Sequence, residues 1–153
     1  MKGYLQAIFI APVASEPMVS LDEVLAAEGR GLEGDRYHAA AGSYNKDKPG
    51  NRQVTLINGD FFEGSGFAFH ETRRNLVTSG VELMWLIGRE FTIGDGGAAF
   101  YGERYCDPCK RPSTLSGNPI NFNEAFCDKG GLIARVVSSG IIRVGDLMPR
   151  PPR

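Results

Sequence analysis

The sequence predicts a mainly β protein, a small barrel or curled sheet with roughly one to three short helices. Its 20 glycines stand singly at intervals, which is typical of many turns between short strands. Several short runs of β-branched residues are bounded by glycine or proline, as strands usually are. The chain lacks the long helical segments that β-α-β units need. Apolar patterning continues through all 153 residues, which indicates one domain with its own core.

The first half of the chain favours strands joined by loops. YLQAIFIAP predicts a buried strand that ends at a proline. Residues 20–37 predict a short strand or helical turn followed by a loop punctuated by glycines. RQVTLIN predicts another strand, and a brief helix then begins at Asn58 or Asp60. Residues 39–51 contain several turn formers, so we expect a mobile loop at the mouth of a ligand site.

The second half favours a strand, two hairpins and a short helix. RRNLVTSG predicts a strand that ends in a turn. Two runs around GDGG favour a tight β-hairpin, and two β-branched runs around SSG favour a second one. NFNEAFCDKG favours a short helix closed by Gly130, whereas KRPSTLSG is poor helix material. We expect residues 148–153, which are rich in proline, to form a loose tail.

The composition argues against three classes of protein. A formal net charge of −1 does not favour broad nucleic-acid binding, which needs a strongly basic face. No stretch is long enough to span a membrane. Gln6 interrupts the apolar N-terminal run and Pro12 ends it, which favours a strand over a signal peptide and a cytoplasmic protein over a secreted one. The odd number of cysteines fits free thiols better than a disulfide framework.

The motif CDPC, residues 106–109, has several interpretations. A structural zinc site usually has four ligands in paired spacings, but Cys127, His38 and His70 are scattered and form no second pair. A thioredoxin-like redox pair needs a strand-to-helix junction, and poor helix formers follow here. A third interpretation treats both cysteines as small core residues. Cationic neighbours instead favour a thiolate, a nucleophile and soft metal ligand, and the motif lies among charged residues: Glu103, Arg104, Asp107, Lys110 and Arg111.

Two further motifs contain arginines suited to an anion. In GLEGDRY, Asp35 and Arg36 follow a glycine that favours positive φ. They fit equally well an internal ion pair that fixes a turn and an arginine presented to an anion. In TRRNLVTSG, Arg73 and Arg74 on a strand would point to opposite faces, one toward a pocket and one toward solvent. A fully solvated pair is the alternative. Asn75 adds an amide, and the set suggests a site for a phosphate-bearing ligand.

These motifs, in this order, resemble the MOSC domain, the module named after the C-terminal part of molybdenum-cofactor sulfurases. The ordered set is specific although each motif alone is weak, and the chain is similar to the small stand-alone bacterial members. The matching stretches cover almost the whole chain and are IFIAP, GRGLEGDRY, RQVTLIN, RRNLVTSGVEL, LIGREFTIGDG, CDPC and GGLIARVVSSGIIRVGD.

The resemblance implies a MOSC-like β-barrel that binds the molybdenum cofactor, a pterin dithiolene carrying a phosphate. It implies either sulfur transfer to the cofactor or molybdenum-dependent reduction of N-hydroxylated compounds, so the chain is a sulfurtransferase, an oxidoreductase or a non-catalytic carrier of the cofactor. The implied partners are a cysteine desulfurase, a molybdoenzyme or an external reductase. The eukaryotic sulfurase also contains a pyridoxal-phosphate-dependent desulfurase, which has no counterpart in residues 1–153, so we expect no pyridoxal phosphate in this chain alone.

The resemblance also assigns the site residues. It implies that Cys109 carries sulfur or ligates molybdenum. Pro108 fixes the backbone ahead of it, and the cations that follow favour its ionised form. We expect Cys106, which precedes the acidic Asp107, to have no direct role. The residues expected to bind the phosphate end of the cofactor are Asp35, Arg36, Arg73, Arg74 and Asn75.

Overall fold

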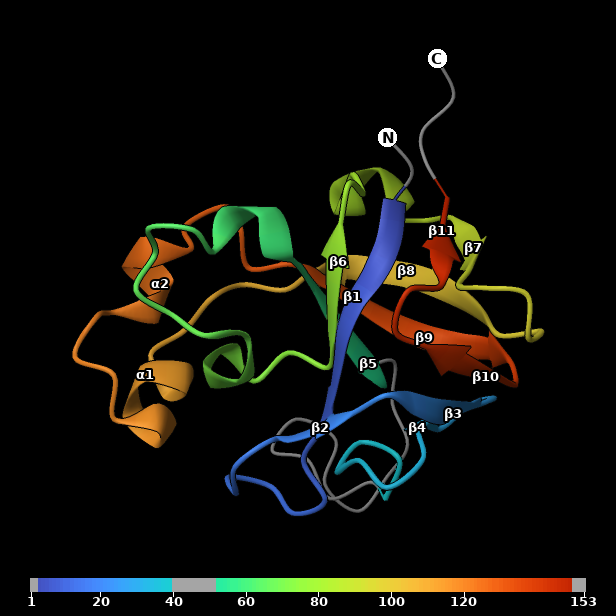
Figure 1. The fold of residues 1–153 in the computed structure, drawn as a ribbon, viewed down its shortest axis with the longest axis horizontal. Helices are drawn as coiled ribbons and strands as arrows, with labels where there is room; N and C mark the ends of the chain where they lie inside the picture. The colour runs from blue at the N-terminus through green and yellow to red at the C-terminus, as the bar shows by residue number, and fades with distance from the viewer. Residues whose placement is uncertain (1–2, 40–51, 150–153) are drawn as a thin grey trace.

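The computed structural model describes residues 3–39 and 52–149, and short strands dominate it (Figure 1). The predicted loop at residues 39–51 lies outside the described residues from residue 40 onward. No described helix is long and apolar enough to cross a membrane. The strands are β1 (Gly3–Ile10), β2 (Val19–Leu21), β3 (Glu23–Ala27), β4 (Gly31–Leu32), β5 (Val54–Asn58), β6 (Leu76–Ser79), β7 (Glu90–Thr92), β8 (Ala99–Tyr105), β9 (Leu132–Ser138), β10 (Gly140–Arg143) and β11 (Leu147–Met148).

Helical structure is confined to short segments. The predicted brief helix after Asn58 is present as a 3-10 turn, because the Asn58 side chain accepts a hydrogen bond from Asp60 N at 2.9 Å. The α-helices are α1 (Arg111–Ser116) and α2 (Phe122–Ala125), and the 3-10 turns are η1 (Gly59–Phe61), η2 (Phe69–Thr72) and η3 (Leu83–Leu86).

Eight strands form a main sheet in the order β11-β1-β6-β5-β9-β8-β7, with β2 also paired to β1. A small second sheet contains β10, β3 and β4. The prediction of a barrel needs correction, because the described strands β7 and β11 stand at opposite ends of the main sheet and do not pair. They are short strands of three and two residues. A hydrogen bond of 2.9 Å from Gly94 N to Leu147 O still brings the two ends close together.

One of the two predicted hairpins is present and the other is wrong. β7 and β8 pair in antiparallel fashion around GDGG, as predicted. The runs around SSG do not form a hairpin. One edge of β9 pairs with β8. The other edge pairs with β5 at residues 132–134 and, nearer SSG, Val136 O accepts a hydrogen bond from Gly29 N at 2.9 Å, so β9 has no free edge for β10. The chain therefore leaves the main sheet, and β10 pairs with β3 in the small sheet.

Both α-helices differ from the predictions. KRPSTLSG forms α1, because Pro112 lies in the first turn, where its missing N–H costs nothing. Gly117 ends α1 in a left-handed conformation and donates to Ser113 O at 3.0 Å. The short helix predicted within NFNEAFCDKG is present as α2, but it is not closed by Gly130. It is capped at Phe126, and Asp128, with φ of 62°, then turns the chain away.

The hydrophobic core has two parts. Aliphatic side chains from both sheets, with Phe91 and Phe100, form the larger part. Aromatic side chains beside the two helices form the smaller part, in which Phe122 stacks on Phe126 with ring centroids 4.8 Å apart. In Figure 1 the helices lie on the left and the small sheet at the lower right. Met148, which we assigned to the tail, is buried in β11, and residues 150–153 lie outside the described residues.

Candidate functional site: an arginine-lined cavity

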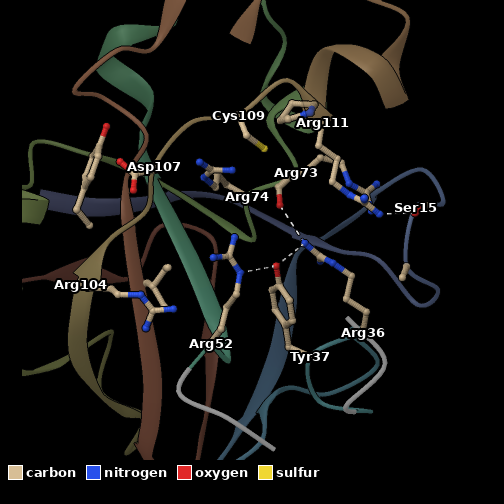
Figure 2. Close-up of a pocket in the computed structure, with 14 residues that line it drawn as sticks. Ser15, Arg36, Tyr37, Arg52, Arg73, Arg74, Arg104, Asp107, Cys109 and Arg111 are labelled. Atoms are coloured by element: carbon tan, nitrogen blue, oxygen red, sulfur yellow. Dashed lines mark hydrogen bonds between the residues drawn. The ribbon is translucent and has the colours of Figure 1, made fainter. Parts of the chain in front are cut away.

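A cavity of about 290 Å³ lies where loops at the ends of several strands meet (Figure 2). Segments that are far apart in the sequence form it: the chain after β1, the chain after β4, the residues just before β5 and β6, and the connection from β8 to α1. The lining residues are Ala14, Ser15, Arg36, Tyr37, Arg52, Arg73, Arg74, Arg104, Tyr105, Asp107, Cys109, Arg111, Pro112 and Ile133.

The charge of this cavity is opposite to that of the whole chain. Six arginines line it and Asp107 is the one acidic residue among its described lining, although the chain has a net charge of −1. Among the described residues, Arg73, Arg74, Arg104 and Arg111 form no ion pair with a carboxylate. So much uncompensated positive charge at one place favours an anionic ligand.

Asp35 and Arg36 combine the two roles between which the sequence could not decide. Asp35 is buried outside the cavity, accepts hydrogen bonds from Ala11 N at 2.8 Å and Tyr37 N at 3.2 Å, and pairs with Arg36 Nη1 at 3.0 Å. Arg36 lines the cavity, and its Nη2 donates to Tyr37 Oη and to Arg73 O. Asp35 thus fixes the turn, and the turn presents Arg36 to the cavity.

Arg73 and Arg74 do not lie on a strand, because β6 begins only at Leu76. Arg73 follows η2 in a left-handed conformation with φ of 64°, which turns both side chains toward the cavity. The prediction that one of them faces solvent is therefore wrong. Burial, reinforced by the nearby charge of Arg36, lowers the pKa of Arg73 to about 10.

Arg74 contains an unsatisfied donor. It is only 4% exposed, and its Nε donates to Gly130 O at 2.8 Å and its Nη1 to Thr72 O at 3.2 Å. Its guanidinium also packs over the Phe122 ring, 5.3 Å from the centroid. The remaining nitrogen, Nη2, is buried without a hydrogen-bond partner. Because a buried N–H normally has an acceptor, this atom points to a ligand in the cavity.

Asn75 is not among the lining residues of the cavity. Its side chain is fully buried, where Oδ1 accepts from Thr55 N at 3.0 Å and from Thr55 Oγ1 at 3.2 Å. Its Nδ2 donates to Phe9 O at 3.1 Å. The side chain therefore joins the residues just before β6 to β1 and β5, and it positions the two arginines ahead of it.

The three cysteines have different surroundings, and all are free thiols. Cys109 is exposed and lines the cavity, whereas Cys127 is exposed outside it. Cys106 is 1% exposed, and Arg52 Nη2 donates to its Sγ at 3.7 Å. Among the residues that the structure describes, no group of three or more His, Cys, Asp or Glu side chains could hold a metal ion, so CDPC has no zinc partners there.

Gly130 has a role at the site that differs from the predicted helix end. A Cβ at Gly130 would lie 2.1 Å from Cys106 O and 2.8 Å from Pro108 Cδ. The absence of a side chain therefore lets the CDPC segment pack directly against Gly130, whose carbonyl also accepts the hydrogen bond from Arg74. Its N–H donates to Tyr105 Oη at 3.3 Å. Burial nevertheless raises the pKa of Tyr105 above its usual 10.0.

Sequence reasoning did not assign a binding role to several residues of the site. Arg52 is the first residue of the predicted strand RQVTLIN, although β5 begins at Val54, and it gave no signal beyond its charge. Arg104 and Arg111 stood out only as neighbours of the cysteines. The remaining unassigned residues with polar side chains are Ser15, Tyr37, Tyr105 and Asp107.

Comparison with known proteins assigns the chain to a family. The model of the MOSC domain matches residues 51–148, whereas no curated protein matches the chain. The crystal structure of the YuaD protein from Bacillus subtilis is similar, with a TM-score of 0.78 and 19% identity over 97% of this chain and 94% of that one.

Two crystal structures of YiiM are also similar. The protein from Geobacillus stearothermophilus has a TM-score of 0.66 and 15% identity over 95% of this chain and 73% of that one. The protein from Escherichia coli has a TM-score of 0.69 and 16% identity over 100% of this chain and 71% of that one. At these identities the three likenesses establish a common fold. The family match covers more than half of the chain, and the chain therefore belongs to the MOSC domain family.

Proposed function

We propose that this chain binds the molybdenum cofactor in the arginine-lined cavity and carries sulfur on Cys109. One observation supports this most strongly: six arginines and an exposed cysteine line the same small cavity. The MOSC domain is associated with this cofactor and with sulfur transfer. An arginine cluster suits its phosphate, and a thiolate suits both molybdenum and sulfur chemistry.

The residues present fit such a ligand. Arg74 has a buried donor atom, Nη2, that lacks an acceptor, and a phosphate oxygen would satisfy it. Arg36 is already held by Asp35, so it loses little conformational freedom when it binds an anion. The cavity volume of about 290 Å³ is close to the lower end of the range for ligand sites, about 300–1,000 Å³.

The chain's own residues divide the work between binding and chemistry. The arginines would hold the phosphate, and Pro112 and Ile133 contribute apolar surface to the same cavity. When bound, the cofactor supplies a molybdenum centre that can accept sulfur. Cys109 lines the cavity and is exposed, so a partner protein can reach it. This exposure favours sulfur carriage over reduction of N-hydroxylated compounds, which needs no access for a sulfur donor.

Loading of Cys109 is a simple exchange. Its thiolate attacks the outer sulfur of a persulfide on a donor protein such as a cysteine desulfurase. A new S–S bond forms on Cys109, the S–S bond of the donor breaks, and the donor leaves as a thiolate. The transferred sulfur keeps its proton and its oxidation state, so no oxidant or reductant is needed. Cys106 takes no part, because it is buried and outside the cavity.

The test uses protein produced in a host that synthesises the cofactor. We expect bound molybdenum by metal analysis and a pterin by fluorescence, and we expect Arg74→Gln to reduce both. After treatment with a persulfide donor, mass spectrometry should find added sulfur in the wild type and in Cys127→Ser, a matched exposed cysteine. Cys109→Ser should lose it, and Cys106→Ser should keep most of it.

Three outcomes would contradict parts of this proposal. Absence of molybdenum and pterin at any stoichiometry would refute cofactor binding. Cofactor retention without a persulfide on Cys109 would refute sulfur carriage and leave a non-catalytic carrier. Equal damage from Cys106→Ser and Cys109→Ser, in variants with wild-type circular dichroism, would show that the two cysteines act as a pair.

A further inference from the structure

We propose that the cavity binds two linked anionic groups of one ligand, in the simplest case a diphosphate, through two separate groups of arginines. The inference rests on the proposed function in that it takes the arginine-lined cavity as the ligand site. It goes further because a single phosphate leaves half of the arginines unused. The ligand class would then be molecules that carry a diphosphate or two neighbouring phosphates.

The charge count exceeds what one phosphate can neutralise. Apart from Arg52, the described lining of the cavity contains five arginines and Asp107, and Asp35 already neutralises Arg36. Subtracting these two aspartates from the five arginines leaves three positive charges. A phosphate monoester carries a charge of about −1.5 to −2 at neutral pH. Roughly a third to a half of the excess charge would remain beside such a ligand, whereas a terminal diphosphate would neutralise more of it.

The first group consists of Arg36, Arg73 and Arg111. Arg36 Nη2 donates to the carbonyl of Arg73 at 3.2 Å, and Arg111 Nη2 donates to Ser15 Oγ. The charges of Arg36 and Arg111 both act on Arg73 and help to lower its pKa. Because these three positive charges repel one another, one anion bound between them would stabilise all three. In Figure 2 these side chains lie on the right.

The second group consists of Arg52, Arg74 and Arg104, which lie to the left of the first group in Figure 2. Arg52 and Arg104 line the cavity from segments next to β5 and in β8. None of the three is among the charges that act on Arg73. This group contains the buried Arg74 Nη2 that lacks an acceptor. Each group therefore has its own unmet demand for an anion.

Tyr37 joins the two groups. Its hydroxyl oxygen accepts from Arg36 Nη2 at 3.1 Å and from Arg52 Nε at 3.1 Å. These two hydrogen bonds use both lone pairs of the oxygen, so the hydroxyl hydrogen remains to be donated. Tyr37 also lines the cavity. It thus places one more donor between the groups, where an oxygen shared by two phosphates would lie.

The experiment compares phosphate with pyrophosphate by isothermal titration calorimetry on the full chain freed of cofactor. Both are measured without divalent cations and at one ionic strength, because salt screens charge attraction. We expect pyrophosphate to bind at least about tenfold more tightly, since each added charge-assisted hydrogen bond is worth about that factor or more. Arg111→Gln removes an exposed member of the first group and Arg104→Gln one of the second.

Each variant should lose most of the preference for pyrophosphate, because only one of the two groups of arginines remains intact in it. Arg143→Gln removes an exposed arginine of β10 outside the cavity and should change neither affinity. Equal wild-type affinities for the two ions would overturn the inference. So would variants that weaken both ions by the same factor, which would indicate one shared subsite.

The inference and the proposed function fail in different ways. Pyrophosphate preference in a protein that never retains molybdenum or pterin would refute the proposed function and uphold two anion subsites. Retained cofactor with equal phosphate and pyrophosphate affinities would refute the subsites and uphold the proposed function. The comparison of phosphate with pyrophosphate on the wild-type protein needs no variant. The inference can therefore be refuted even if a variant fails to fold.

Discussion

Replacing Asn75 by alanine separates two roles for this residue. The sequence alone suggested that its amide contacts the ligand, whereas the structure places the amide in the core. There it holds Thr55 of β5 and Phe9 of β1 to the segment that leads into β6. If Asn75 contacts the ligand, Asn75→Ala should lose ligand binding with little change in stability. If Asn75 is a core residue, the variant should lose stability, and any loss of binding should follow from that.

The size of the effect follows from the groups that Asn75→Ala leaves behind. Thr55 N–H loses the acceptor at 3.0 Å, and the Phe9 carbonyl loses the donor at 3.1 Å. An unsatisfied buried group costs about 1–3 kcal/mol. For the two groups together, we therefore expect the free energy of unfolding to fall by about 2–6 kcal/mol. A typical domain has about 5–15 kcal/mol in total, so the loss should be easy to measure.

Urea unfolding followed by tryptophan fluorescence and circular dichroism measures this change. Thr55→Val is the matched control. It removes a hydroxyl that accepts from Asn75 N at 3.1 Å, but the same N–H also reaches Thr55 O at 3.0 Å. We therefore expect Thr55→Val to lower the free energy of unfolding by only about 1 kcal/mol. Wild-type stability in Asn75→Ala, together with lost phosphate binding, would refute the reasoning and return Asn75 to the ligand site.

Three further predictions test the surroundings of the cavity. Gly130→Ala forces the CDPC segment away and should lower the free energy of unfolding in urea by at least about 2 kcal/mol. The control Gly117→Ala has open space but a positive φ and should lower it by about 1 kcal/mol. Equal losses in the two variants would contradict the close packing at Gly130. Carbon NMR of the guanidinium groups should find one arginine that titrates near pH 10, absent in Arg73→Gln, and phosphate should raise its midpoint. Because the folded protein releases this proton before the unfolded chain does, the contribution of Arg73 to stability should rise from pH 10 to 12.5. In a spectrophotometric titration, Tyr105→Phe should remove a phenol that ionises above pH 10.0, and an unchanged curve would refute the raised pKa.

The local sequence pattern predicted those strands and turns that form whatever strands lie beside them. It failed where the pairing of a strand depends on the rest of the sheet. β1, β5 and the β7–β8 hairpin follow from β-branched runs and turn residues. The hairpin around SSG has equally good local signals. It does not form because both edges of β9 are hydrogen-bonded to segments from elsewhere in the sequence, namely β8 on one edge and β5 with Gly29 on the other. No window of the sequence contains that information.

The site shows the same limit. Charge and spacing identified Arg36, Arg73, Arg74 and Cys109, and the structure brings all four to one cavity. Arg52 was missed because an arginine before a strand is usually solvated, and only the fold places it beside Tyr37 and Cys106. Asn75 was assigned to the ligand because residue type does not reveal burial. Sequence identified suitable side chains, and the tertiary structure decided which of them face the cavity.

The positive charge in the cavity also links binding to stability. Four arginines without carboxylate partners lie together among the described residues, and the lowered pKa of Arg73 reflects the cost of holding its charge there. An anion that binds only the folded protein removes part of this cost and stabilises the fold according to its concentration and affinity. Arginine pairs such as Asp35–Arg36 fix the geometry before binding, at the expense of burying charge. Repulsion among the arginines is therefore strongest when the cavity contains no anion. Binding of an anion relieves this repulsion, and that relief adds to the binding free energy.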